Sequence, residues 1–144
     1  MKLQTTSAVI SFAKRLEDES AKFYEELSQK YAEGKEGFLS FAKENRKNIV
    51  QTERTYFGVI SDAIEGCFAF DVDPDKYTVE MVLDKNASYS DALGKAIEIE
   101  EKIGQFYSDA AEQSKSLMAD IPRIFVRIAK KRGERIAKLK ALQG

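Results

Sequence analysis

The spacing of the apolar residues constrains this chain more than any other feature. They recur at steps of three and four through four long segments, over about residues 6–32, 38–64, 88–110 and 120–142. This period places them on one face of an α-helix. Only two prolines, Pro74 and Pro122, occur in 144 residues, so long helices are not interrupted. We therefore predict an all-α chain of four amphipathic helices.

Residue types that start or stop helices lie between these segments. Gly34 and Gly37 mark a turn after the first segment, and Gly66 is well placed to stop the second. Ser88 to Asp91 fits the capping box that starts a helix. The connection over residues 66–88 is long, and its apolar run, Val79 to Leu83, is predicted to form one or two helical turns.

An internal repeat indicates that the chain has two similar halves. The first helix of each half shares four residues at a separation of 83: Ala13, Glu17, Phe23 and Tyr24 recur as Ala96, Glu100, Phe106 and Tyr107. The second helix shares four at a separation of 87: Phe38, Ala42, Lys43 and Ile49 recur as Phe125, Ala129, Lys130 and Ile136. We predict a single domain over residues 1–144, in which two αα-hairpins pack as a four-helix bundle and the middle connection, 66–88, forms a crossover.

Composition limits the function that such a bundle can have. The chain has 23 Lys and Arg against 24 Asp and Glu, which argues against a basic nucleic-acid binder. It contains no histidine, which excludes Ser-His, Cys-His and His-ligated metal sites. The single cysteine, Cys67, cannot form an internal disulfide, and we expect it to be a small apolar residue that is buried or half-buried. Without a membrane-spanning run or a signal-peptide core, we expect a cytoplasmic protein with no membrane partner.

Several polar residues fall on the apolar faces of the predicted helices. The neighbours of Glu100 at helical spacing are largely apolar, for example Leu93 and Ile103, so its carboxylate faces the core. Because an unpaired buried charge is strongly destabilising, such groups must meet each other, a metal or water. The same reasoning selects one or two residues in each helix: Glu17, Asn45, Asn48, Glu100, Arg132 and Arg135.

At these residues the chain resembles the rubrerythrin-like branch of the ferritin-like superfamily. That family holds two iron ions with a Glu on each of two helices and a Glu-x-x-His motif on each of the other two. Its Glu helices often carry an aromatic pair shortly after the Glu, as Glu17 is followed here by Phe23-Tyr24 and Glu100 by Phe106-Tyr107. The resemblance extends over essentially the whole chain. It implies a ferritin-like four-helix bundle and a homodimer.

The sequence departs from the family at the metal ligands. Asn45-x-x-Asn48 and Arg132-x-x-Arg135 stand where the family has its two Glu-x-x-His motifs. We expect the two arginines to occupy the metal space and to pair with Glu17 and Glu100. The remaining hydrogen bonds at the centre are expected to come from Asn45 and Asn48, and from Tyr24 or Tyr107 beside them.

These departures lead us to expect a non-enzymatic binding, scaffold or regulatory protein with a degenerate di-iron site. We expect no catalytic residue, no cofactor and no metal, and we leave open an unidentified protein partner. The alternative is a rubrerythrin-like oxidoreductase or iron-binding protein with a rearranged site. Its cofactor would be iron or another divalent metal. Two Glu and two Asn could also hold Mg²⁺ or Ca²⁺, which prefer oxygen ligands.

Three further features have simpler structural interpretations. Asp71, Asp73 and Asp75 resemble the start of an EF-hand loop, but Val82 stands where a bidentate Glu belongs, so we predict a turn with helix-capping Asp residues. Residues 123–140 carry eight cations and one acid; we attribute them to complementary bundle surfaces and not to nucleic-acid binding, which is not expected. Gly133 lies inside a helix, which a local kink or a close helix contact would explain.

Overall fold

The helices form where the apolar period predicts them. The computed structural model describes residues 2–59, 69–117 and 120–143. Within these ranges the chain forms four long α-helices, one short 3₁₀ helix and no strand. The elements are α1 (Thr6–Lys30), α2 (Lys35–Val59), η1 (Pro74–Lys76), α4 (Tyr89–Gln113) and α5 (Asp120–Gln143). The prediction of an all-α chain built as a four-helix bundle is confirmed.

Side-chain caps fix where α1 and α4 begin. The hydroxyl of Thr5 accepts a hydrogen bond from the N–H of Ala8 at 3.1 Å. Ser88 and Asp91 form a reciprocal capping box, in which each side chain bonds the backbone N–H of the other. These bonds satisfy N–H groups that would otherwise lack a partner in the first turn of the helix. The capping box predicted at Ser88 is confirmed.

The turn between α1 and α2 is shorter than the sequence predicts. Gly34 has φ of +72°, a left-handed conformation that glycine adopts without steric strain. The N–H of Phe38 then bonds the carbonyl of Gly34 at 3.0 Å, which starts the helix at Lys35. The assignment of Gly37 to the turn is therefore wrong, because this bond places it within the first turn of α2.

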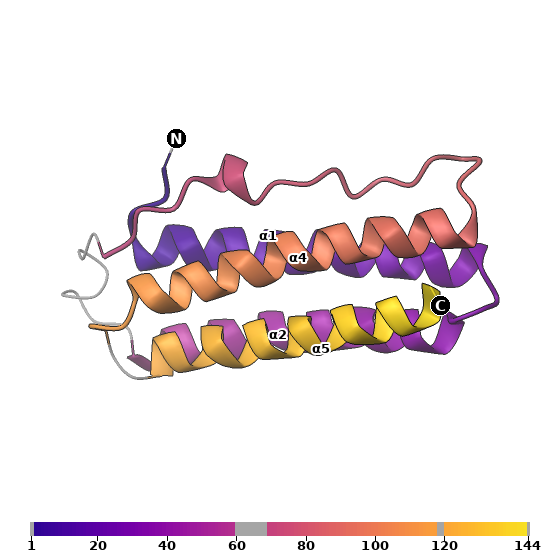
Figure 1. Ribbon diagram of the computed structural model, residues 1–144. Helices are drawn as coiled ribbons and strands as arrows, with labels where there is room; N and C mark the ends of the chain where they lie inside the picture. Colours follow the sequence, from indigo (N-terminus) through magenta and orange to yellow (C-terminus); the bar gives the residue numbers. More distant parts are fainter. Residues whose placement is uncertain (1, 60–68, 118–119, 144) are drawn as a thin grey trace.

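The four helices lie side by side along their lengths (Figure 1). α1 packs mainly against α2 and α4 mainly against α5, with smaller contacts between α2 and α5 and between α1 and α4. Aromatic rings join the pairs across the core: Phe12 of α1 meets Phe106 of α4 with 5.2 Å between ring centroids. This arrangement turns one face of every helix towards the centre of the bundle.

The segment from residue 69 to 88 runs along the bundle from one end to the other (Figure 1). The prediction of helical turns over Val79 to Leu83 is wrong, because these residues are extended. Burial alternates along the segment, with Tyr77 and Val79 buried and Thr78 and Glu80 exposed, which is the period of an extended chain. The Tyr77 ring packs on Phe106 with 5.5 Å between centroids. Burial of alternate side chains against the helices replaces the expected helical turn.

Some predictions concern residues that the structure does not describe. Cys67, Gly66 and the end of the second predicted segment, residues 60–64, lie outside the described residues. None of the helices in the described part of the chain has the length and apolar content needed to cross a bilayer.

Two glycine variants test the turn geometry. Gly34→Ala should lower the free energy of unfolding by about 1–2 kcal/mol, since an L-residue is strained at positive φ and its Cβ would lie 2.7 Å from the Tyr89 hydroxyl. Gly37→Ala is the matched control, because its Cβ would meet nothing within 4 Å, and it should raise stability by about 0.4–1 kcal/mol. Urea denaturation followed by circular dichroism measures both; stabilisation by both variants would contradict this geometry.

Candidate functional site

All eight site residues selected from the sequence meet at the centre of the bundle. Each helix contributes two of them, and each is at most 3% exposed. Arg132 and Arg135 are the largest of the fully buried side chains. The eight are Glu17 and Tyr24 from α1, Asn45 and Asn48 from α2, Glu100 and Tyr107 from α4, and Arg132 and Arg135 from α5.

Arg132 joins the two buried glutamates. Its Nη2 donates to Glu17 Oε1 at 2.6 Å, and its Nη1 donates to Glu100 Oε2 at 2.7 Å and to Oε1 at 3.0 Å. The planar guanidinium has five N–H donors in a fixed fork, which lets it bond two carboxylates at once. One side chain from α5 therefore ties α1 to α4.

Arg135 lies one turn further along α5 and links the centre to α2. Its Nη1 contacts Glu100 Oε2 at 3.4 Å, and its Nη2 donates to the Phe41 carbonyl at 3.2 Å. The guanidinium carbon lies 4.9 Å from the centroid of the Phe41 ring, a distance at which a cation is attracted to the ring face. Its closest carboxylate is Glu44, whose Oε1 accepts from Nη2 at 2.8 Å and from Nε at 3.1 Å.

Each of the two buried tyrosines bonds a glutamate in the other half of the chain. Tyr24 of α1 donates to Glu100 Oε2 of α4 at 2.7 Å, and Tyr107 of α4 donates to Glu17 Oε2 of α1, also at 2.7 Å. Each Tyr lies seven residues after the Glu of its own helix. Two helical turns of separation therefore let each hydroxyl reach the carboxylate of the opposite helix.

The two asparagines complete the site from α2. Asn48 Nδ2 donates to Glu17 Oε1 at 3.2 Å. Asn45 Nδ2 does not reach a glutamate side chain; it donates to the Glu17 carbonyl at 3.2 Å and to the Ser20 hydroxyl at 2.7 Å. Asn45 Oδ1 and Arg132 Nε are buried without a hydrogen-bond partner among the described residues.

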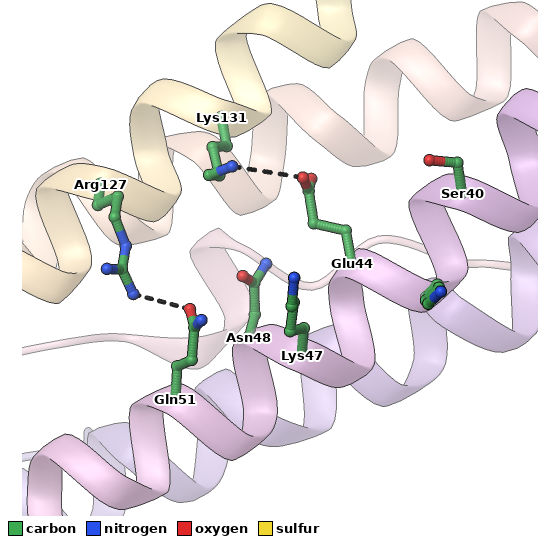
Figure 2. Close-up of a pocket in the computed structure, with 8 residues that line it drawn as sticks. Ser40, Glu44, Lys47, Asn48, Gln51, Arg127 and Lys131 are labelled. Atoms are coloured by element: carbon green, nitrogen blue, oxygen red, sulfur yellow. Dashed lines mark hydrogen bonds and ion pairs between the residues drawn. The ribbon is translucent and has the colours of Figure 1, made fainter.

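Glu44 belongs to this network and was missed by the sequence argument. Its side chain is 31% exposed and also contacts Lys131 Nζ at 3.6 Å through Oε2 (Figure 2). Its neighbours at helical spacing are mixed, with Phe41 beside Ser40 and Lys47. A residue at such a boundary gives no clear periodic signal, and only the position of Arg135 on the facing helix could have identified it.

Burial and the neighbouring charges change the pKa values of these groups. Burial, together with the adjacent carboxylates, raises the pKa of Tyr24 and Tyr107 well above the ordinary value of 10.0. Burial alone would lower the pKa of Arg132, but Glu100 and Glu17 raise it well above its usual range. Burial likewise opposes ionisation of Glu44, yet the Arg135 hydrogen bond and charge bring its pKa below the ordinary 4.5. The site is thus arranged to hold two cations against carboxylates.

The side chains at this site do not suit a di-iron centre. Every carboxylate oxygen of Glu17 and Glu100 already accepts at least one hydrogen bond. A metal ion bound by both would have to displace the guanidinium of Arg132 and add charge beside two buried cations, which is strongly unfavourable. In the described parts of the chain, no group of three or more His, Cys, Asp or Glu is placed to hold a metal.

The remaining sequence features take simple structural roles. Asp73 caps η1 by accepting from the N–H of Asp75 at 3.0 Å, so the predicted turn with a capping Asp is confirmed. Gly133 faces outwards, and nothing lies within 4 Å of its Cβ position. The expectation of a close helix contact at this residue is therefore wrong. The close contact belongs to Gly104, whose Cβ position lies 3.7 Å from Arg132 Cβ.

Comparison of the chain with known protein families, with curated proteins and with solved structures finds no match. No relative therefore assigns an activity to this site.

Loss of one carboxylate should expose the energetic role of the network. Glu100→Gln is expected to lower the free energy of unfolding by about 3–5 kcal/mol, because it leaves buried positive charge without its partner. Urea unfolding measures the change. Glu101→Gln, on the exposed side of the same helix, is the control and should change stability by less than about 0.5 kcal/mol. Equal effects of the two variants would show that the buried pairing is not stabilising.

The buried tyrosines should make the fold sensitive to alkali. The folded state raises the pKa of Tyr24 and Tyr107 above 10.0, so it favours their neutral form. Their contribution to stability is complete below pH 10 and is lost as the pH rises above that value. The melting temperature should fall steeply above pH 10, and the fall should be shallower in Tyr24→Phe/Tyr107→Phe. Parallel curves for the two proteins would contradict the assignment.

Proposed function

We propose that this chain is a ferritin-like, rubrerythrin-like bundle in which an interior Glu/Arg network stands in place of the di-iron centre. In this proposal the protein is non-enzymatic and acts as a binding, scaffold or regulatory protein. The observation that carries it is the position of the Arg132 guanidinium, which is bonded to Glu17 and Glu100 at 2.6 and 2.7 Å. These are the two carboxylates that the family resemblance assigns to metal.

The arrangement of the helices supports the ferritin-like part of the proposal. α1 packs mainly on α2 and α4 on α5, which favours two αα-hairpins. The segment 69–88 lies between the two pairs in the sequence and runs the length of the bundle along its outside (Figure 1), which favours the crossover connection of that family. The proposal includes a cytoplasmic homodimer, and the dimer rests on the sequence resemblance.

The balance of charge at the site supports the proposal that a Glu/Arg network stands in place of the metal ions. In the family, the negative charge of the carboxylates is balanced by metal ions. Here two buried glutamates face two buried arginines, and Glu44 meets Lys131 at the edge of the same network. The site is formally neutral without metal. The alternative of a rearranged metal-binding oxidoreductase would require both arginines to leave a site in which they are at most 2% exposed.

Iron titration tests the proposal directly. The wild-type chain, loaded anaerobically with Fe(II) and desalted, should retain only substoichiometric iron by elemental analysis. A variant that restores the family ligands, Asn45→Glu/Asn48→His/Arg132→Glu/Arg135→His, should retain about two iron ions per chain. Stoichiometric iron in the wild type, lost on Glu17→Gln, would overturn the proposal and favour the metal-binding alternative.

A further inference from the structure

A polar pocket of about 440 Å³ opens between α2 and α5 beside the buried network (Figure 2). Its volume is in the range of small-molecule binding sites, but its lining is polar where most such sites are apolar. Its lining includes four cationic side chains and one carboxylate: Lys43, Lys47, Arg127, Lys131 and Glu44. A ligand that suits this lining is itself polar.

Positive charge dominates the pocket. Four cationic side chains surround it against one carboxylate, Glu44. Glu44 already accepts two hydrogen bonds from Arg135, a buried cation outside the pocket lining, at 2.8 and 3.1 Å. Arg135 is shared between Glu44 and the buried Glu100, and Glu44 also contacts Lys131 at 3.6 Å. This one carboxylate can therefore balance at most one of the four pocket cations.

The pocket cations are available to a ligand. Lys43 and Lys47 have no ion-pair or hydrogen-bond partner among the residues that the structure describes. Among the described residues, Arg127 bonds only the neutral amide of Gln51, at 2.7 Å. Lys131 lies 3.6 Å from Glu44 and keeps 47% of its side chain exposed. Figure 2 shows Arg127 and Lys131 reaching from α5 towards α2 across the pocket.

From this arrangement we infer that the pocket between α2 and α5 binds a small anion carrying several phosphate groups. Phosphate oxygens suit both the planar fork of Arg127 and the point charges of the lysines, and Ser40 and Gln51 add neutral hydrogen-bonding groups. No aromatic ring is found among the described residues that line the pocket, and these residues offer no platform for stacking bases of a nucleic acid. This inference rests on the proposed function, since it names the ligand class of a protein proposed to act by binding.

Calorimetric titration at low salt tests the site with inorganic tripolyphosphate. We expect saturable binding of one ion per chain that weakens as salt is added, because the cations are exposed. Lys43→Gln/Lys47→Gln should weaken binding at least about tenfold. The matched control, Lys85→Gln/Lys115→Gln, removes the same charge from exposed positions outside the pocket and should leave the affinity unchanged.

Titrations with other phosphate-containing ligands distinguish which kind of molecule carries the phosphate groups. Adenosine triphosphate that binds as tightly as tripolyphosphate indicates recognition of the phosphates alone, and tighter binding indicates a nucleotide ligand; both support the site. Absence of saturable binding, or equal weakening by the control variant, overturns it. A single-stranded oligonucleotide is tested in the same way. If it binds more tightly than tripolyphosphate, and if both double variants weaken its binding equally, the pocket assignment is overturned in favour of an extended nucleic-acid surface. Stoichiometric iron in the wild type would overturn only the proposed function, because Lys43 and Lys47 do not contact the buried glutamates.

Discussion

The bonds from Arg132 to Glu17 and Glu100 are the interaction on which the rest of this structure depends. Two carboxylates buried near each other repel, and neither can be solvated inside the bundle. A guanidinium removes the repulsion and replaces the lost solvation, because its fork bonds two carboxylates at once and because it is less strongly hydrated than an ammonium group. The 2.6 and 2.7 Å contacts join α5 to α1 and α4 simultaneously. They fix the register of three helices in a way that apolar packing alone, which tolerates sliding, does not.

The internal repeat explains why the two halves differ where they do. The Glu and Tyr positions are the same in both halves, and each Tyr bonds the Glu of the other. The second helices differ: α2 places Asn45 and Asn48 at the positions where α5 places two arginines. Arginine in both halves would set four buried cations against two carboxylates, and asparagine in both would leave two carboxylates uncompensated. Only the asymmetric choice makes the centre neutral, so the divergence of the halves follows from charge balance.

Helical period was sufficient to predict the four helices and the polar residues at their centre. Glu100 and Arg132 stand out in the sequence because their neighbours at helical spacing are apolar, and burial in the bundle follows from that pattern. The apolar pattern over Val79 to Leu83 led to a wrong prediction of helix, because a short apolar run fits a helix and an extended segment equally well. Helical period failed for Glu44 because its position on the edge of the apolar face is defined only by the facing helix. Both failures concern residues whose environment is set by packing between elements.

Glu44 also connects the buried network to the surface. Arg135 is committed to Glu44 and to the Phe41 carbonyl, so the carboxylate nearest to the pocket is paired from the inside. On the outside, Lys131 contacts Glu44 at 3.6 Å, whereas Lys43 and Lys47 have no ion-pair partner among the described residues. If α5 carried a neutral residue in place of Arg135, the charge of Glu44 would be balanced by the pocket cations alone, and the positive field in the pocket would weaken. Arg135 therefore acts on two features at once, the neutrality of the buried network and the charge of the pocket at the surface.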